Sequence, residues 1–295
     1  MKDAIERFAR EISSWKVLVV GESIQDEFLP VTYEGHSMKS NCPVLRLEGE
    51  PIVQDGGAGA IANHLRDFVQ QVDLVTNAPG TIVKTRYYDK FDIKKHVEIN
   101  RFARFEAHEA RFDPAAYDVV IVADFGHGFC DHLSAGSGYC FMAQTNSNNF
   151  GFNRISKWKD YRKKMVALDL REASLQMNRR FTAMGDKELL ELYDYELNTE
   201  ILFVTLGAKG SVFTNGKQIV RQPVFVNEHI VDTIGAGDTF FAFASLVSHL
   251  PNPEPFLFIP ALAANLSTTW LCNEKSVTLQ TLQDHANKFL SAGIQ

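Results

Sequence analysis

The sequence predicts an α/β fold with a doubly wound, mostly parallel sheet that is flanked by helices. Short, continuous apolar runs are typical of parallel strands that are buried on both faces of a sheet. Such runs occupy residues 16–21, 118–123, 165–168 and 201–205. Helical stretches lie between most of them, and strand alternating with helix favours parallel strands joined by crossovers. We expect helices at residues 58–70, 187–197, 239–250, 255–271 and 279–291.

Three further elements follow from local patterns. Residues 1–14 place apolar side chains at helical spacing, without the apolar core of a signal peptide, and therefore predict an amphipathic helix. Glycines and serines between residues 126 and 138 favour helix poorly, so the crossover after the second apolar run is expected to be short or irregular. Asn215-Gly216, between residues 211–214 and 217–220, predicts a β-hairpin.

Two segments, at about residues 28–50 and 81–105, break this pattern. They alternate or look extended, as in residues 44–47 and 96–102. Alternation is typical of strands with one buried face. We expect both segments to be insertions that form a small sheet within one domain spanning residues 1–295. Such a sheet needs its apolar face covered, which predicts a homodimer joined through these strands.

Composition excludes several classes of protein. The chain has 295 residues, a net charge of −6 and no basic stripe, which argues against a nucleic-acid partner held through its phosphates. No apolar run approaches the roughly 20 residues that a membrane span needs. Cys42, Cys130, Cys140 and Cys272 lie far apart, so neither a disulfide framework nor a zinc site is expected. We expect a cytoplasmic protein.

Residues 232–238 carry the chemistry. They read Asp-Thr-Ile-Gly-Ala-Gly-Asp and precede an apolar run of helical length. A glycine-rich turn that opens a helix directs backbone N–H groups and the positive end of the helix dipole at an anion. An acid beside that point can take a proton from an attacking hydroxyl. Gly235, Ala236, Gly237 and Asp238 are therefore candidates for phosphoryl transfer to an alcohol. The alternative is a helix N-terminus that uses small residues and a capping acid.

This stretch resembles the C-terminal signature of the ribokinase (PfkB) family of carbohydrate kinases. The resemblance implies a ribokinase-like fold with a small β-sheet lid over the sugar, a lid that often forms a dimer interface in the family. It implies that ATP and Mg²⁺ are required and that Asp238 is the catalytic base. It also implies that the amides of Gly235, Ala236 and Gly237 hold the transferring phosphoryl group.

Residues 205–210, Thr-Leu-Gly-Ala-Lys-Gly, resemble the nucleotide-contacting motif of the same family. The resemblance implies that Thr205, Gly207 and Gly210 bind the nucleotide, since glycines let backbone amides turn toward phosphates. A plain strand-to-hairpin turn would use the same glycines.

Two positions resemble cation sites of the family. Residues 169–172 match an Asn-x-x-Glu motif whose Glu arranges Mg²⁺ and its waters around the phosphates. Glu172 fits this motif, and Asp169 stands in place of the Asn. A hard divalent ion accepts a carboxylate there. Asp232 matches the acid that shapes a monovalent-cation site in many relatives, which implies K⁺.

The acceptor side depends on Asp26, Gly56, Gly57 and Asn63. Asp26 follows the first strand, where the resemblance implies a carboxylate that binds sugar hydroxyls; the alternative is a loop acid in solvent. Gly56 and Gly57 resemble the family's Gly-Gly motif, where backbone approaches the sugar closely. The family's Asn stands where this chain has Ala60. Asn63 lies one helical turn later, and it either reaches the substrate or serves packing.

Within the family, the chain is most similar to the heptose-phosphate kinase branch. Residues 81–86 resemble its Thr-x-x-Lys-x-Arg lid strand, and residues 122–128 resemble its Asp-Tyr-Gly-Lys-Gly segment, with His127 in place of Lys. Lys84 and Arg86 are then candidates to bind a phosphate of the acceptor. The alternative makes both of them solvent-facing lid residues.

The sequence thus predicts an ATP-dependent kinase that transfers the γ-phosphoryl group to a hydroxyl of a sugar or a sugar phosphate. One alternative is a nucleoside kinase or another small-alcohol kinase on the same scaffold. A second alternative is a catalytically silent protein that binds a sugar or a nucleotide, because a fold does not fix a function.

Overall fold

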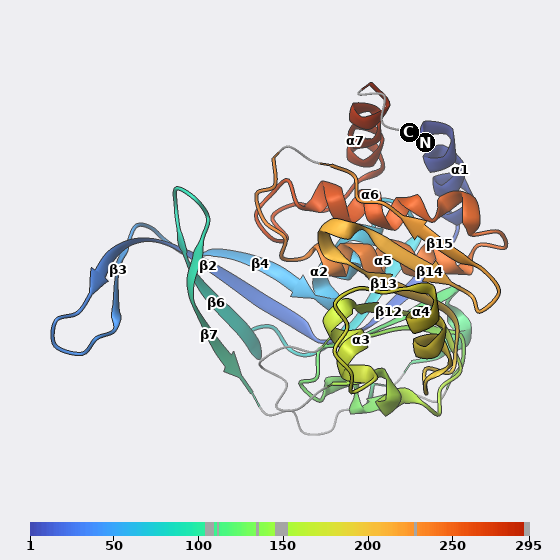
Figure 1. Ribbon diagram of the computed structural model, residues 1–295, viewed down its shortest axis with the longest axis horizontal. Coiled ribbons are helices and arrows are strands. Elements are labelled where there is room, and N and C mark those ends of the chain that lie inside the picture. The colour runs from blue at the N-terminus through green and yellow to red at the C-terminus, as the bar shows by residue number, and fades with distance from the viewer. Residues whose placement is uncertain (104–108, 111, 134–135, 145–152, 227–228, 292–295) are drawn as a thin grey trace.

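The computed structural model describes residues 1–103, 109–110, 112–133, 136–144, 153–226 and 229–291 (Figure 1). In these residues the main sheet has eight strands, in the order β15-β14-β13-β12-β11-β9-β1-β5. They are β1 (Lys16–Gly21), β5 (Gln71–Thr76), β9 (Val119–Asp124), β11 (Tyr139–Ala143), β12 (Lys163–Asp169), β13 (Thr199–Thr205), β14 (Ser211–Thr214) and β15 (Ile219–Gln222). Neighbouring strands pair in parallel except at one edge, where β14 runs antiparallel to both β13 and β15. The predicted mostly parallel sheet is confirmed.

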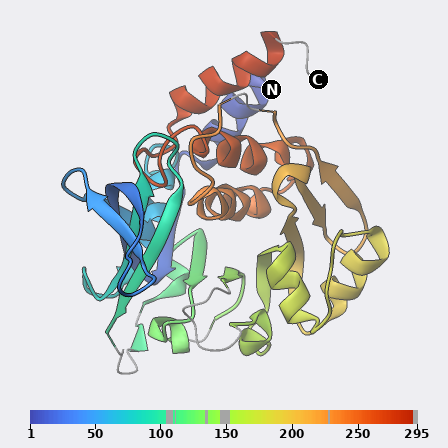
Figure 2. The same cartoon turned by 60° about the vertical axis from the view of Figure 1, so that its left-hand side comes forward.

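Helices cover both faces of this sheet (Figures 1 and 2). One face carries α1 (Lys2–Ile12), α2 (Ala58–Leu65), α5 (Ala236–His249), α6 (Phe258–Ser267) and α7 (Leu279–Ser291), and the other carries α3 (Leu170–Gln176) and α4 (Asp186–Asp194). The four central residues of β1 are all apolar because both faces of the strand are buried: Val17 and Val19 join one core, and Leu18 and Val20 join the other. Helices on both faces confirm the doubly wound arrangement.

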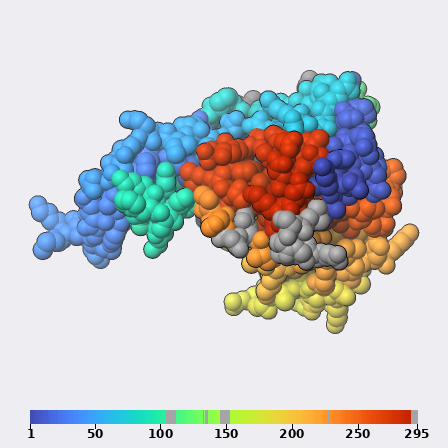
Figure 3. Space-filling model, turned by 90° about the horizontal axis from the view of Figure 1, so that it is seen from above, coloured from blue at the N-terminus to red at the C-terminus, as the bar shows by residue number. Residues whose placement is uncertain are grey.

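The helices also bring the two ends of the described chain together. Helix α7 lies beside α1 (Figure 3). Short 3₁₀ turns complete the main body at Pro114–Ala116 (η1), Phe129–Asp131 (η2), Ile155–Trp158 (η3), Gly207–Lys209 (η4) and Glu254–Phe256 (η5). Over the described ranges, no helix combines the length and the apolar character that crossing a membrane requires.

A second sheet of five strands extends away from the main body (Figures 1 and 3). Its strands are β2 (Ser23–His36), β3 (Pro43–Leu47), β4 (Ile52–Gly57), β6 (Ile82–Asp89) and β7 (Lys95–Phe102). Strand β2 pairs with β3, β4 and β6, and β6 pairs with β7. The predicted small sheet is confirmed, but it is larger than expected, because residues 23–27 and 52–57 also belong to it. Residues 104 and 105 of the predicted insertion lie outside the described residues.

The irregular crossover and the hairpin are both confirmed. Between β9 and β11 the described residues hold η2 and the two-residue strand β10 (His132–Leu133), which pairs with β8 (Glu109–Ala110). The hairpin joins β14 to β15 with Gly216 at φ +80°, although the second strand begins at Ile219 and not at residue 217.

Four local predictions were wrong or incomplete. Helix α2 ends at Leu65 and not near residue 70, and β5, which was not predicted, follows at residue 71. As an edge strand, β5 is only half-buried and lacks the continuous apolar run of the inner strands. Helix α3 was also missed, because it is one short segment that begins directly after β12. Helix α6 begins only at Phe258, after η5.

A small apolar cluster joins the small sheet to the main body. Phe28 of β2 and Tyr88 of β6 pack with Leu271 and Cys272, and Ile234 is among the residues packed against them. Ile234 lies just before α5. The small sheet is therefore seated on the segment that leads into the predicted phosphoryl-binding turn.

Candidate active site

One cavity of about 660 Å³ brings most of the candidate residues together. It lies at the carboxyl ends of β12 and β13, where ligands of open α/β sheets bind. The candidates that line it are Asp26, Gly57, Lys84, Arg86, Asp169, Thr205, Gly207, Gly210, Gly235, Ala236, Gly237 and Asp238. The lining, as far as the described residues define it, does not include Gly56, Asn63, Glu172 or Asp232. Asn63 lies on α2 and does not line the cavity with the other candidates.

The glycine turn at residues 235–237 opens α5 into this cavity. Gly235 precedes the helix with φ +83°, and a Cβ atom there would also collide with the Asn273 side chain. A Cβ atom at Gly237 would meet nothing within 4 Å, so open space lies beside this residue. The N–H groups in the first turn of a helix lack partners within the helix and attract anions. The turn thus offers an anion site next to Asp238.

Asp238 lies in the first turn of α5 and is only 8% exposed. The backbone amide of Gly57 hydrogen-bonds to its carboxylate, but the Oδ1 atom has no hydrogen-bond partner among the described residues. Burial, together with the neighbouring Asp26 carboxylate, raises the pKa of Asp238 to about 7, against the opposing effect of Lys84. A carboxylate with a pKa near neutrality can take a proton from a hydroxyl at physiological pH.

Strand register explains why three acceptor-side candidates face the cavity together. Asp26 on β2 lies opposite Lys84 on β6, and Phe28 lies opposite Arg86 two residues further on. Residues opposite each other share a face of the sheet, and alternate residues of a strand return to that face. One face of the small sheet therefore presents Asp26, Lys84 and Arg86 to the cavity.

Arg86 is held between two carboxylates. Its Nη1 atom donates to Asp26 Oδ1, and its Nε atom donates to Glu98 Oε2 at 2.8 Å. Arg86 and Lys84 are 7% and 6% exposed, and Asp26 is 4% exposed. The alternatives that placed these three residues in solvent are therefore wrong.

Lys84 differs from Arg86 because no described residue accepts a hydrogen bond from its ammonium group. Burial lowers the pKa of Lys84, and the nearby carboxylates of Asp26, Glu98 and Asp238 oppose that effect. Since Arg86 is already paired within the protein, Lys84 is the cation of this face that remains available to a ligand.

Gly56 and Gly57 have different roles. A Cβ atom at Gly56 would collide with the Asp26 carboxylate, so this glycine makes room for Asp26 and does not itself line the cavity. Gly57 lines the cavity with φ +62°, and a Cβ atom there would collide with the Glu22 carbonyl. Only Gly57 fits the expected close approach of backbone to a ligand.

The turn at residues 205–210 also lines the cavity. Gly207 and Gly210 adopt φ values of +57° and +88°, and Leu206 N donates to Gly210 O at 2.8 Å. Thr205, Gly207 and Gly210 all line the cavity beside α6. The turn therefore serves the β13–β14 connection and also presents backbone to the cavity.

Asp169 and Glu172 form a capping box at the start of α3. Asp169 Oδ1 accepts from Glu172 N at 2.6 Å, and Glu172 Oε2 accepts from Asp169 N at 2.7 Å. The Glu172 carboxylate thus turns onto its own helix, whereas Asp169 is exposed and lines the cavity. Carboxylate oxygens are the ligands that Mg²⁺ prefers, so Asp169 fits a magnesium role better than Glu172 does.

Asp232 does not fit the predicted monovalent-cation site. Its Oδ1 atom accepts from Lys95 Nζ at 2.6 Å and from Ile234 N at 3.2 Å, and its side chain is 3% exposed. Its Oδ2 atom has no hydrogen-bond partner among the described residues, but the Lys95 ammonium group already balances the charge of this carboxylate and would repel a second cation.

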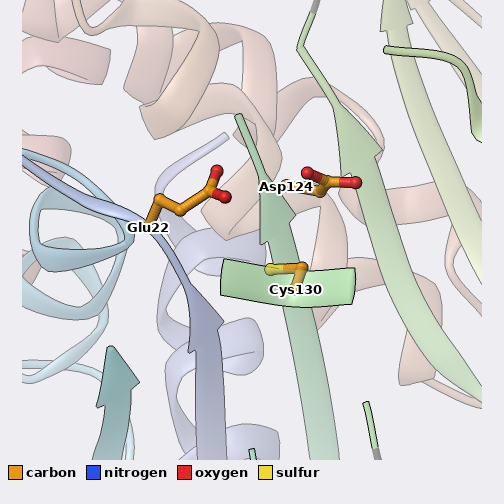
Figure 4. A group of neighbouring side chains, drawn as sticks. All are labelled: Glu22, Asp124 and Cys130. Carbon is orange, nitrogen blue, oxygen red and sulfur yellow. The ribbon is translucent and has the colours of Figure 1, made fainter. Parts of the chain in front are cut away.

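A buried cluster of Glu22, Asp124 and Cys130 lies next to the cavity, with ligand-type atoms within 4.8 Å of one another (Figure 4). Glu22 accepts from three backbone amides of residues 125–129, and Asp124 accepts from Lys157 Nζ at 3.1 Å. Burial raises the pKa of the Cys130 thiol, which disfavours the thiolate that a metal needs. The cluster therefore holds the loop at residues 125–129 and is poorly suited to a metal.

Sequence reasoning missed several residues of this region. Glu22 follows β1, and Asp124 is the last residue of β9. The strand order reverses between these two strands, so the rule for such switch points could have found both residues. Glu98, Lys95 and Asn273 carry no local signal, because each acts through a partner that is distant in sequence.

Comparison with known proteins agrees with this geometry. Residues 170–268 match the family model described as pfkB family carbohydrate kinase. None of the curated proteins searched matches the chain. The matched segment contains both the turn at residues 205–210 and the glycine turn at residues 235–237.

Solved structures resemble the protein over nearly its whole length. The ribokinase of Thermotoga maritima has a TM-score of 0.68 and 18% identity, covering 92% of this chain and 99% of its own. An Arabidopsis thaliana ribokinase complexed with ribose and ATP has a TM-score of 0.63 and 15% identity, covering 92% and 98%. The adenosine kinase of Sinorhizobium meliloti has a TM-score of 0.66 and 17% identity, covering 93% and 100%. The ribokinase-like fold predicted from the sequence is confirmed.

Proposed function

We propose that the protein is an ATP- and Mg²⁺-dependent kinase of the PfkB family that phosphorylates a hydroxyl of a sugar or a sugar phosphate. The observation that carries this proposal is the Asp238 carboxylate, which is buried, has an oxygen without a partner among the described residues and lies beside the glycine turn of α5. A binding protein without turnover would have no use for a base in this position. The catalytically silent alternative is therefore disfavoured.

In this proposal Asp238 takes the proton of the attacking hydroxyl, and the first-turn amides of α5 stabilise the charge on the transferring phosphoryl group. The turn at residues 205–210 binds the nucleotide in the same cavity. Mg²⁺, when bound, would neutralise charge on the nucleotide phosphates; Asp169 would hold it, and Glu172 would hold Asp169 in place.

The acceptor would lie between the small sheet and Asp238. Asp26 would accept hydroxyl hydrogens, and Gly57 would let the acceptor approach the backbone. The ammonium group of Lys84 favours an acceptor that carries an anion, such as a heptose-phosphate-like sugar phosphate. Arg86 would hold Asp26 and would not bind the acceptor directly. A nucleoside kinase is the second candidate, because the S. meliloti adenosine kinase shares the fold.

A ligand screen tests the proposal most directly. The unfolding temperature should rise with a non-hydrolysable ATP analogue, and it should rise further with the correct member of a panel of sugars, sugar phosphates and nucleosides. The acceptor identified in this way should then release ADP from ATP in a coupled assay. Stabilisation by nucleosides alone would select the second candidate, and stabilisation by no combination would contradict the kinase proposal.

We also propose that the protein is a homodimer joined through the outer face of the small sheet, and that it is cytoplasmic, where its four free cysteines would stay reduced. On that face Val53, Glu27, Thr85 and Ile99 form one row across four strands. Val53 is 56% exposed and Ile99 is 48% exposed. Exposed apolar side chains on a small sheet favour burial against a second copy.

Light scattering should therefore give twice the mass of the chain at micromolar concentration. The Ile99→Lys variant should give a monomer, because a charge would face the partner's apolar surface. Leu190→Lys is the control, since Leu190 is an exposed leucine on α4, away from the small sheet. A monomeric wild type would remove the dimer proposal and leave the kinase proposal unaffected.

A further inference from the structure

The ion pair between Lys95 and Asp232 links two parts of the chain that are 137 positions apart. Lys95 is the first residue of β7 in the small sheet, and Asp232 lies three residues before the glycine turn. The 2.6 Å separation of Lys95 Nζ and Asp232 Oδ1 is that of a charge-assisted hydrogen bond. The small sheet is thus joined by a charge pair to the segment that precedes the proposed phosphoryl site.

The Asp232 carboxylate also fixes the path of the chain into that site. Its Oδ1 atom accepts from Ile234 N, and the backbone amides of Val231 and Asp232 both donate to Thr268 O at the end of α6. These bonds leave little freedom to residues 231–234. Gly235, the residue that follows, must keep its left-handed conformation for α5 to open into the cavity.

Burial and apolar neighbours strengthen the ion pair between Lys95 and Asp232. The side chain of Asp232 is 3% exposed and that of Lys95 is 26% exposed. Ile234 packs in the apolar cluster that includes Tyr88, which lies opposite Lys95 in the strand register. A buried carboxylate needs a cation, and apolar neighbours that exclude water strengthen the attraction. Among the described residues, Lys95 is the only ion-pair partner of Asp232.

We propose that the ammonium group of Lys95 is the resident cation of Asp232, which closes this position to a monovalent metal ion, and that Lys95 thereby positions the glycine turn. The part of this proposal that concerns phosphoryl transfer rests on the proposed kinase function. The part that concerns the cation does not, because it predicts how stability depends on K⁺ whatever reaction the protein catalyses. Lys95 is a positioning residue, since it acts on the turn through Asp232.

The test compares Lys95→Met with Lys94→Met. Methionine keeps the apolar stem of lysine and removes its charge. Lys94 is the matched control, because it is the exposed neighbour of Lys95 and is not part of the ion pair. Unfolding temperatures are measured in KCl and in tetramethylammonium chloride at equal ionic strength, since tetramethylammonium is too large to replace an ammonium group in a buried pair.

The wild type and Lys94→Met should have the same unfolding temperature in both salts. Lys95→Met should unfold roughly 5–15 °C lower in tetramethylammonium chloride, because a buried carboxylate has lost its partner. KCl should restore part of this loss, because K⁺ can then approach Asp232. Lys95→Arg should behave like the wild type, and it keeps the test decisive if Lys95→Met fails to fold.

Kinetics provide a second measurement once an acceptor is known. Lys95→Met should lower kcat and leave the KM of the acceptor nearly unchanged, with KCl restoring part of kcat. A wild type that is specifically stabilised by K⁺ would overturn the proposal, and so would a Lys95→Met variant that matches Lys94→Met in both salts. A protein without kinase activity that still shows the predicted salt response would contradict only the proposed function.

Discussion

Replacing Asp238 by Asn should lower turnover and raise stability at the same time. Asparagine keeps the shape of the side chain and can accept the hydrogen bond from the Gly57 amide, but it cannot take a proton from a hydroxyl. Loss of a general base should lower kcat by roughly 10²–10⁴-fold. A substitution that only damaged the fold would lower both activity and stability, so the opposite signs identify the base.

The size of the stability gain follows from the pKa of Asp238, which rises from 3.8 to about 7 on folding. The folded state therefore holds the proton more tightly than the unfolded state, and the wild type loses stability as the pH rises from about 4 to about 7. At about 1.36 kcal/mol for each pKa unit, the raised pKa of Asp238 destabilises the folded state by about 4 kcal/mol at pH 8, where the buried carboxylate is charged, and by about 2 kcal/mol at pH 5, where folding must take up a proton. Asparagine carries no charge and avoids this loss.

Urea unfolding at both pH values, together with turnover, measures the two effects. The free energy of unfolding of Asp238→Asn should exceed that of the wild type more at the higher pH than at the lower one. Asp55→Asn is the control, because Asp55 is an exposed carboxylate on β4. Equal stability of variant and wild type at both pH values would refute the raised pKa of Asp238, and near wild-type turnover would refute its role as the base.

Two further substitutions separate the parts of the cavity. Gly237→Val should abolish turnover with folding intact, because an added Cβ atom meets only open space in the protein and would occupy the proposed phosphoryl site. Calorimetry should show that acceptor binding is retained. Loss of acceptor binding would mean that the phosphoryl site and the acceptor site are not separate. Lys84→Met should raise the KM of an anionic acceptor by roughly 10-fold or more, as expected for loss of a charge-assisted hydrogen bond, and leave that of a neutral sugar unchanged. An equal effect on both acceptors would show that Lys84 does not bind the anion.

The fold was largely predictable because its signals are local. Buried parallel strands such as β1 and β9 contain a continuous apolar run, so they stand out in the sequence. Edge strand β5 and the short helix α3 were missed, since a half-buried strand and a single helical segment carry weak patterns. The small sheet was detected through its alternation, but β4 was not, because its glycines looked like a turn motif.

Part of the candidate site was also local. Residues 235–238 and 205–210 are contiguous motifs, so their functional groups could be identified from the sequence alone. The structure places both motifs on one cavity. Asn63 and Glu172 were expected at the substrate and at the metal from their positions in motifs. The structure leaves Asn63 away from the cavity and turns Glu172 onto the N-terminus of its own helix.

The sequence by itself determined most of the strands and helices, the glycine turn and the identity of the acid beside it, because these depend on residues that are neighbours in the chain. Only the tertiary structure decided the burial, the pKa values and the ion-pair partners of the site residues. The raised pKa of Asp238 comes from burial beside Asp26, and the pairing of Arg86 with Asp26 comes from the register of β2 and β6. Lys95 meets Asp232 across 137 positions. Burial and ion pairing depend on distances in space, which packing of remote segments sets and no local pattern encodes.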